Sequence, residues 1–139
     1  MVPGPARIVL RGHGVSVCER CVIAQRPLAR AKGLLGRKQE LAAGEGLLLK
    51  PAPSIHTWFM RFPIDAVFLD RNMSVIAIEE DLRPWRTAGR RGARAVLELR
   101  SGESRRRGIK RGDRLSVEPI LTDVPVVFVR TPAASEEFS

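Results

Sequence analysis

Glycine and proline divide this chain into short runs, and this punctuation most limits what the chain can fold into. The 139 residues contain 12 Gly and 10 Pro. Residues 93–99 and 112–118 alternate apolar and polar side chains, which is typical of strands with one buried face. We expect seven to nine short strands, drawn from residues 6–10, 15–24, 47–49, 55–60, 64–69, 74–82, 93–99, 112–118 and 124–129.

One segment has the pattern of a helix. Pro27 suits the first helical position and Gly36 suits the end, and Leu28 and Leu34 lie between them at helical spacing. Residues 101–110 leave room for one further helical turn. Strands and helices do not alternate, so a parallel sheet is not expected. The predicted fold is therefore mainly β: a single-domain β-sandwich or partly open barrel with one short helix.

Length and composition favour one soluble domain with a hydrophobic core, since 44% of the residues are apolar. No run of 18 apolar residues predicts a membrane span, and the first ten residues do not resemble a secretory signal. We therefore expect a cytoplasmic protein. We expect an N-terminal arm that can add an edge strand (residues 1–12), a β-domain (13–119) and a C-terminal extension with a mobile end (120–139).

Residues 54–70 gather aromatic side chains together with polar ones that an apolar strand has no packing reason to carry. Asp65 lies in an apolar run, and a buried carboxylate needs a partner or a raised pKa; Arg37 and Arg61 are the plausible partners. In the structural interpretation, an ion pair or backbone hydrogen bonds pin this strand to the helix. In the functional interpretation, the segment forms a small-ligand pocket lined by Arg37, His56, Trp58, Arg61 and Asp65.

Catalysis is the weaker alternative. His56 and Asp65 could form a general-base pair, but no serine or cysteine lies at a recognisable nucleophile turn. Alternation predicts that Glu98 faces solvent and pairs with a neighbouring arginine. A non-enzymatic binding or accessory module that needs no cofactor is the favoured interpretation.

The net charge of +9 is concentrated in one segment. Residues 83–114 contain 12 basic and three acidic residues, so they account for the whole excess. Nucleic acid or an acidic protein could bind such a segment, although 20 Arg against four Lys also fits a compositional bias. Trp85 has two interpretations: it stacks on the bases of a bound nucleic acid, or it packs its loop back onto the domain. The candidate anion-binding residues are Arg83, Trp85, Arg86, Arg90, Arg91, Arg105 and Arg106.

Cys18 and Cys21 form a single Cys-x-x-Cys. In a regular strand over residues 15–24, side chains three apart point to opposite faces, which would prevent a disulfide or shared metal ligation. His13 and His56 could complete four zinc ligands, but neither has metal-like spacing. The sequence therefore favours two structural thiols and no metal site, with a redox pair or a zinc site as the weaker alternatives.

Five short motifs follow one another in a set order: residues 33–37 (GLLGR), 46–49 (GLLL), 62–70 (FPIDAVFLD), 96–99 (VLEL) with Gly102, and 108–113 (GIKRGD). In this order the chain resembles the domain of unknown function 192 family over about residues 15–118. The resemblance implies a compact, mainly β sandwich with one helix, and it implies no activity. Many members carry Trp-Met-Lys-Asn shortly before the Pro-x-Asp, whereas this chain has His-Thr-Trp-Phe at residues 56–59.

Overall fold

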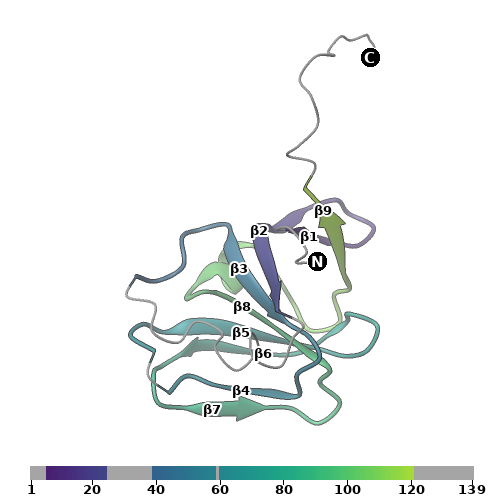
Figure 1. Ribbon diagram of the computed structural model, residues 1–139. Helices are drawn as coiled ribbons and strands as arrows, with labels where there is room; N and C mark the ends of the chain where they lie inside the picture. Colours follow the sequence, from purple (N-terminus) through teal and green to yellow (C-terminus); the bar gives the residue numbers. More distant parts are fainter. Residues whose placement is uncertain (1–5, 25–38, 59, 121–139) are drawn as a thin grey trace, which may run out of the picture.

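The computed structural model describes residues 6–24, 39–58 and 60–120, and it confirms a mainly β fold (Figure 1). Nine strands and one short helix lie in this part of the chain. The helix predicted at residues 27–37 and the edge strand predicted at 124–129 fall outside the described residues. The elements are β1 (Ala6–Leu10), β2 (Ser16–Ala24), β3 (Glu45–Leu49), β4 (Ser54–His56), β5 (Ile64–Leu69), β6 (Val75–Leu82), β7 (Thr87–Gly89), β8 (Ala95–Arg100), α2 (Glu103–Arg106) and β9 (Leu115–Pro119).

The strands form two sheets. Seven make a mixed sheet in the order β6-β5-β8-β3-β2-β1-β9, and β4 pairs with β7 in a small second sheet (Figure 1). The pair β2–β3 is parallel, which corrects the expectation that parallel pairing would be absent. The physical reason is the long connection over residues 25–44, because a crossover of a dozen or more residues lets the chain return in the same direction.

The seven-stranded sheet curls until its two edge strands approach each other. Ser74, just before β6, forms an isolated bridge with Arg114, just before β9. Next to this bridge, the Val75 amide donates to the Asp113 carbonyl at 2.7 Å and the Leu115 amide donates to the Met73 carbonyl at 2.9 Å. In the described part of the chain the sheet is therefore bridged at this point without closing into a full barrel, in agreement with the predicted partly open barrel.

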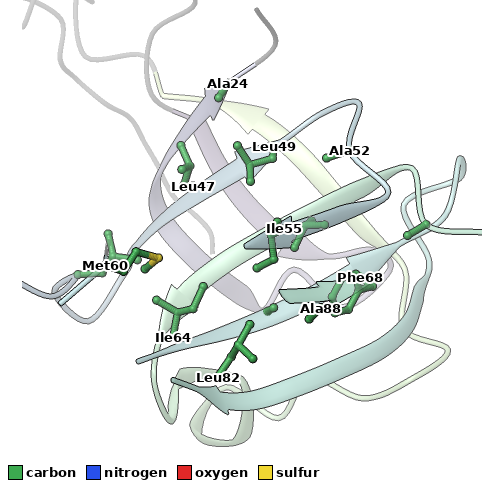
Figure 2. Packing of buried hydrophobic residues seen from close by; sticks show 14 of the residues in the cluster. Ala24, Leu47, Leu49, Ala52, Ile55, Met60, Ile64, Phe68, Leu82 and Ala88 are labelled. Carbon is green, nitrogen blue, oxygen red and sulfur yellow. The ribbon is translucent and has the colours of Figure 1, made fainter. Parts of the chain in front are cut away.

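The curled sheet separates two hydrophobic clusters. All six residues of β5 are buried; Ile64, Ala66 and Phe68 belong to one cluster, and Val67 and Leu69 belong to the other. A strand covered on both faces needs apolar residues in succession, which explains the run in this part of the sequence. Figure 2 shows the first cluster, to which the small sheet contributes side chains from β4 and β7. No helix in the described part of the chain is long and apolar enough to cross a membrane.

The small sheet contains the strand that the sequence pattern missed. Residues Thr87–Gly89 lie outside every strand expected from the sequence, and they pair with Ser54–His56. The strand expected at residues 55–60 ends at His56, because the hydroxyl and the amide of Thr57 form hydrogen bonds with the loop over residues 83–86. The alternation of apolar and polar residues does not predict these hydrogen bonds of Thr57.

Candidate functional site

Thr57 fixes the loop before β7 against the end of β4. Its hydroxyl donates to the Arg83 carbonyl at 2.6 Å and accepts from the Arg86 amide at 2.9 Å. Its own amide donates to the Arg86 carbonyl at 2.8 Å. Thr57 is fully buried, so these bonds do not compete with water. Residues 83–86 are therefore held in one place by the side chain and backbone of a single residue.

Trp85 lies at the centre of this fixed loop in an uncommon conformation. Its φ is 65°, in the left-handed region that favours glycine and asparagine over bulky side chains. Its amide donates to the Thr57 carbonyl at 3.0 Å, which helps to hold that conformation. Trp85 is 58% exposed. The loop thus presents an indole ring at the surface.

The second tryptophan of the chain lies next to the same anchor. Trp58 follows Thr57 directly and is 47% exposed. Its ring lies 5.0 Å from that of His56, centroid to centroid, at an interplanar angle of 38°. His56 is also exposed. Hydrogen bonds through Thr57 therefore join two segments that each carry an exposed tryptophan and that are far apart in the sequence.

A pocket of about 500 Å³ lies between β6 and β7, beside this loop. It falls within the range of 300–1,000 Å³ that is typical of small-molecule sites. Three of its residues, Arg83, Arg86 and Arg90, belong to the predicted anion-binding set, and none of the four described residues of the predicted small-ligand pocket lines it. The lining residues are Glu79, Glu80, Asp81, Leu82, Arg83, Arg86, Thr87, Ala88, Gly89 and Arg90.

Two of the three pocket arginines are engaged by carboxylates. Arg90 contacts Glu79 at 2.8 Å, and Arg83 lies 4.0 Å from Asp81. The Arg86 guanidinium instead donates to the Trp85 carbonyl at 3.4 Å. Among the described residues, Arg86 is thus the pocket arginine whose charge is not paired with a carboxylate.

The basic segment does not form one free cationic surface. Six of its twelve basic residues form ion pairs with carboxylates in the described part of the chain, and five of the six carboxylates lie outside the segment. Of the predicted anion-binding residues, Arg105 pairs with Glu80 at 3.2 Å and Arg106 pairs with Glu103 at 2.6 Å. The excess charge of the sequence is therefore partly compensated by the fold.

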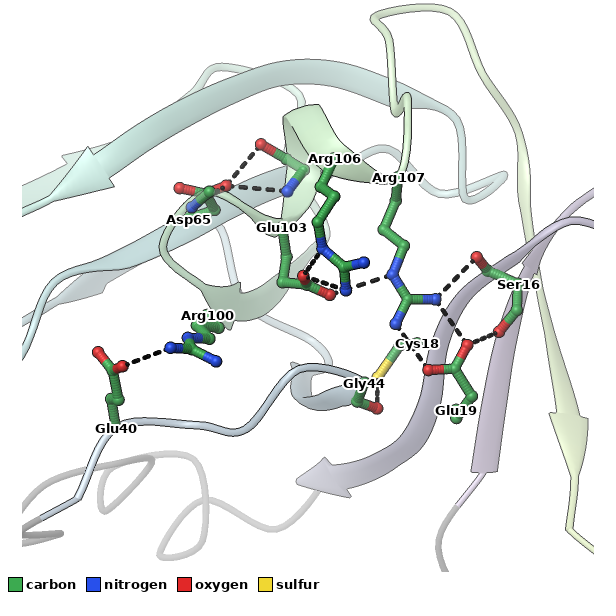
Figure 3. A network of polar contacts seen from close by, with 12 residues as sticks. Ser16, Cys18, Glu19, Glu40, Gly44, Asp65, Arg100, Glu103, Arg106 and Arg107 are labelled. Atoms are coloured by element: carbon green, nitrogen blue, oxygen red, sulfur yellow. Dashed lines mark hydrogen bonds and ion pairs between the residues drawn. The ribbon is translucent and has the colours of Figure 1, made fainter.

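Asp65 is fully buried and has four hydrogen bonds, all from groups other than Arg61. Its Oδ1 accepts from the Asp81 amide at 2.9 Å. Its Oδ2 accepts from the Gly102 amide at 3.1 Å, from the Ser104 amide at 2.9 Å and from the Ser104 hydroxyl at 2.6 Å (Figure 3). These bonds fix the start of α2 to β5 and to the end of β6. Asp65 thus has the bonding of a structural residue.

Among the described residues of the predicted small-ligand pocket, Asp65 and His56 lie on different sides of the large sheet. Ile64 and Ala66 point into the cluster that the small sheet covers, and Asp65 lies between them on β5, so its side chain points to the opposite face. His56 belongs to the small sheet and therefore lies on the other side. No acid–base pair therefore forms between His56 and Asp65. Arg61 is exposed, and Arg37 falls outside the described residues. Among the four described residues of this set, His56 and Trp58 form the one ring contact.

A second polar network joins α2 to β2. The Arg107 guanidinium contacts both Glu19 oxygens, at 2.6 and 2.7 Å, the Ser16 carbonyl at 3.2 Å and Glu103 at 3.0 Å (Figure 3). Hydrogen bonds from Arg107 lower the pKa of Glu19 to about 2. Burial would raise the pKa of Glu103, but its bonds to Arg106 and Arg107 outweigh burial and lower it. This network has a structural role at the end of the curled sheet.

The two cysteines lie on the same face of β2, which corrects the prediction from regular alternation. Ala6 pairs with Cys21 and Ile8 pairs with Cys18, so β2 contains an extra residue, a β-bulge. Both thiols are free and buried. Their mutual hydrogen bond lowers the pKa of Cys18 and, together with burial, raises the pKa of Cys21. No group of three or more potential metal-binding side chains occurs among the described residues.

Glu98 is buried, contrary to the prediction of solvent exposure. It lies on β8 between Leu47 of β3 and Ala66 of β5, and it is 3% exposed. Its Oε1 has no hydrogen-bond partner in the described part of the chain. Burial raises its pKa to about 8, so the side chain is largely protonated at neutral pH. The sequence prediction failed because both faces of β8 are covered.

A family model identifies the family, and two solved structures are similar in fold. The model of the DUF192 family, described as an uncharacterised ACR, matches residues 8–117. A protein of unknown function from Novosphingobium aromaticivorans is similar, with 25% identity, a TM-score of 0.69 and coverage of 81% of this chain and 83% of that chain. A proposed transcription regulator from Sinorhizobium meliloti is also 25% identical, with a TM-score of 0.73 and coverage of 84% and 96%. No curated protein sequence matches.

Proposed function

The chain belongs to the DUF192 family, whose description gives no activity, and from its own residues we propose that it is a binding module for a small anionic ligand. The ligand would occupy the pocket between β6 and β7. The observation that carries this proposal is Arg86, a pocket cation that no carboxylate of the described chain engages.

The physical argument rests on how the cation is held. The backbone of Arg86 is fixed by Thr57, whereas its guanidinium is bound to a single carbonyl at 3.4 Å. A phosphate or carboxylate could replace this long bond by a bidentate, charge-assisted pair. Because the loop is already fixed, little conformational entropy would be lost at the backbone on binding. The site is thus suited to a small anion.

Charge pairing favours a small ligand over a nucleic-acid polymer. A polymer would contact many cations, but Arg90, Arg105 and Arg106 are already paired with carboxylates. Nucleic acid is the rival partner, because one of the similar structures is described as a proposed transcription regulator. An enzyme based on His56 and Asp65 has less support, since these two side chains lie apart.

Isothermal titration calorimetry with inorganic triphosphate and with citrate tests the proposal. We expect one of these anions to bind at low salt, and Arg86→Gln to weaken its binding by at least about tenfold, since a hydrogen bond to a charged group contributes about 1.5–3 kcal/mol. Arg91→Gln is the matched control, because Arg91 is exposed and does not line the pocket.

Thermal unfolding of each variant separates loss of binding from loss of folding. Arg86→Gln retains the backbone bonds to Thr57, so its Tm should stay close to that of the wild type. The proposal fails if neither anion binds the wild-type protein, or if Arg91→Gln weakens binding as much as Arg86→Gln does.

A further inference from the structure

One wall of the pocket between β6 and β7 is acidic. Residues 79–81 of β6 are all acidic, and all three line the pocket. In a regular strand, consecutive side chains point to opposite faces. The pairs Ile64–Leu82 and Ala66–Glu79 place three steps of β6 opposite two steps of β5, so β6 contains an extra residue here, a β-bulge. The bulge thus explains how a row of carboxylates reaches a pocket that also contains three arginines.

Asp81, in this acidic wall, is held in a set orientation. Its φ is 52°, in the left-handed region, and its amide donates to Oδ1 of the buried Asp65 at 2.9 Å. The Ser101 hydroxyl donates to Oδ1 of Asp81 at 2.7 Å. The backbone and one carboxylate oxygen of Asp81 are therefore fixed by β5 and by the segment after β8.

The second carboxylate oxygen of Asp81 is weakly engaged. In the described part of the chain it forms an ion pair with Arg83, whose Nε lies 4.0 Å from Oδ2, beyond hydrogen-bonding distance. Both side chains of this pair are more than half exposed, and such pairs contribute little to stability. Glu79 and Glu80 pair with arginines at the shorter distances of 2.8 and 3.2 Å. Asp81 is thus the carboxylate of the pocket that a ligand could bind most readily.

Asp81 and Arg86 are supported in the same way. A buried side chain holds the backbone amide of each, Asp65 in one case and Thr57 in the other. The charged end of each has a contact longer than an ordinary hydrogen bond, 4.0 Å for Asp81 Oδ2 and 3.4 Å for Arg86 Nη1. Because both residues line one pocket, a ligand with a negative and a positive group could bind both without ordering either backbone.

We propose that the ligand of this pocket is a small anion that also carries an ammonium group, with its carboxylate or phosphate on Arg86 and its ammonium on Asp81. This inference rests on the proposed function and names the ligand class. A charge-assisted hydrogen bond from the ammonium to Oδ2 would replace the 4.0 Å ion pair with Arg83. The acidic wall favours such a ligand over one with negative charge alone, because like charges brought together in a site repel.

Isothermal titration calorimetry at low salt with two matched pairs of probes tests this inference. The pairs are L-glutamate with glutarate and O-phosphoethanolamine with ethyl phosphate, and the members of each pair differ by the ammonium group. In at least one pair the wild-type protein should bind the amino compound about tenfold more tightly, because a hydrogen bond to a charged group is added. The pair that shows this difference identifies the anionic group as a carboxylate or a phosphate.

Asp81→Asn should abolish the difference within that pair. The affinity for the amino compound should fall about tenfold, because the partner of the ammonium is lost. The affinity for the plain anion should stay equal or rise, because a negative charge is removed from the pocket, whereas a folding defect would weaken both. Glu118→Gln, which replaces an exposed acid of β9 outside the pocket, is the control and should bind both compounds as the wild type does.

Thermal unfolding accompanies the binding measurements. Asparagine tolerates φ 52°, and its amide oxygen can accept from the Ser101 hydroxyl, so the Tm of Asp81→Asn should stay close to that of the wild type. Asp81→Gly is a second variant without the carboxylate, unstrained at this φ, and should lose the same affinity. If either folded variant retains the preference for the amino compound, Asp81 is not its partner and the inference is overturned.

The wild-type measurements separate this inference from the proposed function and need no variant at Asp81. If triphosphate or citrate binds through Arg86 while neither amino compound binds more tightly than its plain anion, the ammonium is excluded and the anion site stands. If none of these compounds binds, the proposed function and this inference are both wrong.

Discussion

Glu98 is the residue whose environment departs most from its chemistry. An ionised carboxylate in an apolar layer costs several kcal/mol unless it is paired, and Oε1 of Glu98 has no hydrogen-bond partner in the described part of the chain, so the side chain keeps its proton instead. Asp65, on the neighbouring strand, is also buried, but its carboxylate is stabilised by four hydrogen bonds from Asp81, Gly102 and Ser104. Two buried acids on adjacent strands are therefore accommodated in opposite ways.

The raised pKa of Glu98 predicts a pH dependence of stability. The ordinary value of 4.5 applies in the unfolded state and about 8 in the folded state, so between these pH values the folded protein holds a proton that the unfolded chain has lost. The free energy of unfolding should fall as pH rises through this window, by at most about 1.4 kcal/mol per pH unit. Urea unfolding at pH 5, 7 and 8.5 measures it.

Glu98→Gln removes this titration, so the variant should lose less stability than the wild type between pH 5 and pH 8.5. Glu118→Gln replaces an exposed acid on β9 and should keep the wild-type dependence. Parallel pH profiles for the wild type and Glu98→Gln would contradict the assignment of this dependence to Glu98.

At the scale of elements, the bulge in β2 decides where the thiols lie. The extra residue turns Cys18 and Cys21 to the same face, while the two residues between them are exposed. Gly46 on β3 leaves room for this arrangement, since a Cβ at that position would lie 2.8 Å from the Cys18 sulfur. The pairing of three strands, and not the Cys-x-x-Cys spacing, thus brings the thiols together inside the sheet.

Burial of both thiols predicts that neither reacts in the folded protein. With Ellman's reagent we expect almost no reaction under native conditions and reaction of both thiols in urea. Val15→Cys places a third thiol at an exposed position, and that thiol should react at once. Fast native reaction of one or both original thiols would show that the sheet opens at β2.

At the scale of the whole molecule, the fold redistributes charge. Arginines of the segment that carries the +9 excess form ion pairs with carboxylates of β2, of β6 and of the residues before β3. Cations that are adjacent in the sequence therefore differ in how readily they can bind an anion. The ion pairs are mostly exposed, and each contributes little to stability. Their effect is on which arginines remain available to a partner.

This pairing predicts that two triple variants with the same net charge behave differently on heparin. Arg91, Arg94 and Arg111 have no carboxylate partner in the described part of the chain. Replacing these three by Gln should lower the salt concentration needed for elution the most. Replacing Arg90, Arg105 and Arg106 by Gln should lower it less, because these side chains are held by carboxylates. The reverse order would contradict the importance of pairing.

Strand positions could be predicted well where the signal is local. The bounds of β5 agree with the predicted residues 64–69, and β1 agrees with 6–10, because apolar runs between turn residues define both. The prediction of β4 was too long, and β7 was missed, because a single threonine side chain and a partner strand far along the chain determine them. Tertiary contacts of this kind leave no local periodicity.

By itself, the sequence determined the mainly β class, the positions of most strands, the structural nature of the thiols and the resemblance to the DUF192 family. These depend on composition, periodicity and the order of motifs, which are properties of neighbouring residues. Only the tertiary structure decided that Glu98 is buried and that the cysteines share a face. It also decided that six of the twelve basic residues in segment 83–114 are ion-paired, and that Thr57 joins the segments of Trp58 and Trp85. Each of these depends on strand order and register, which place residues side by side that the sequence keeps far apart.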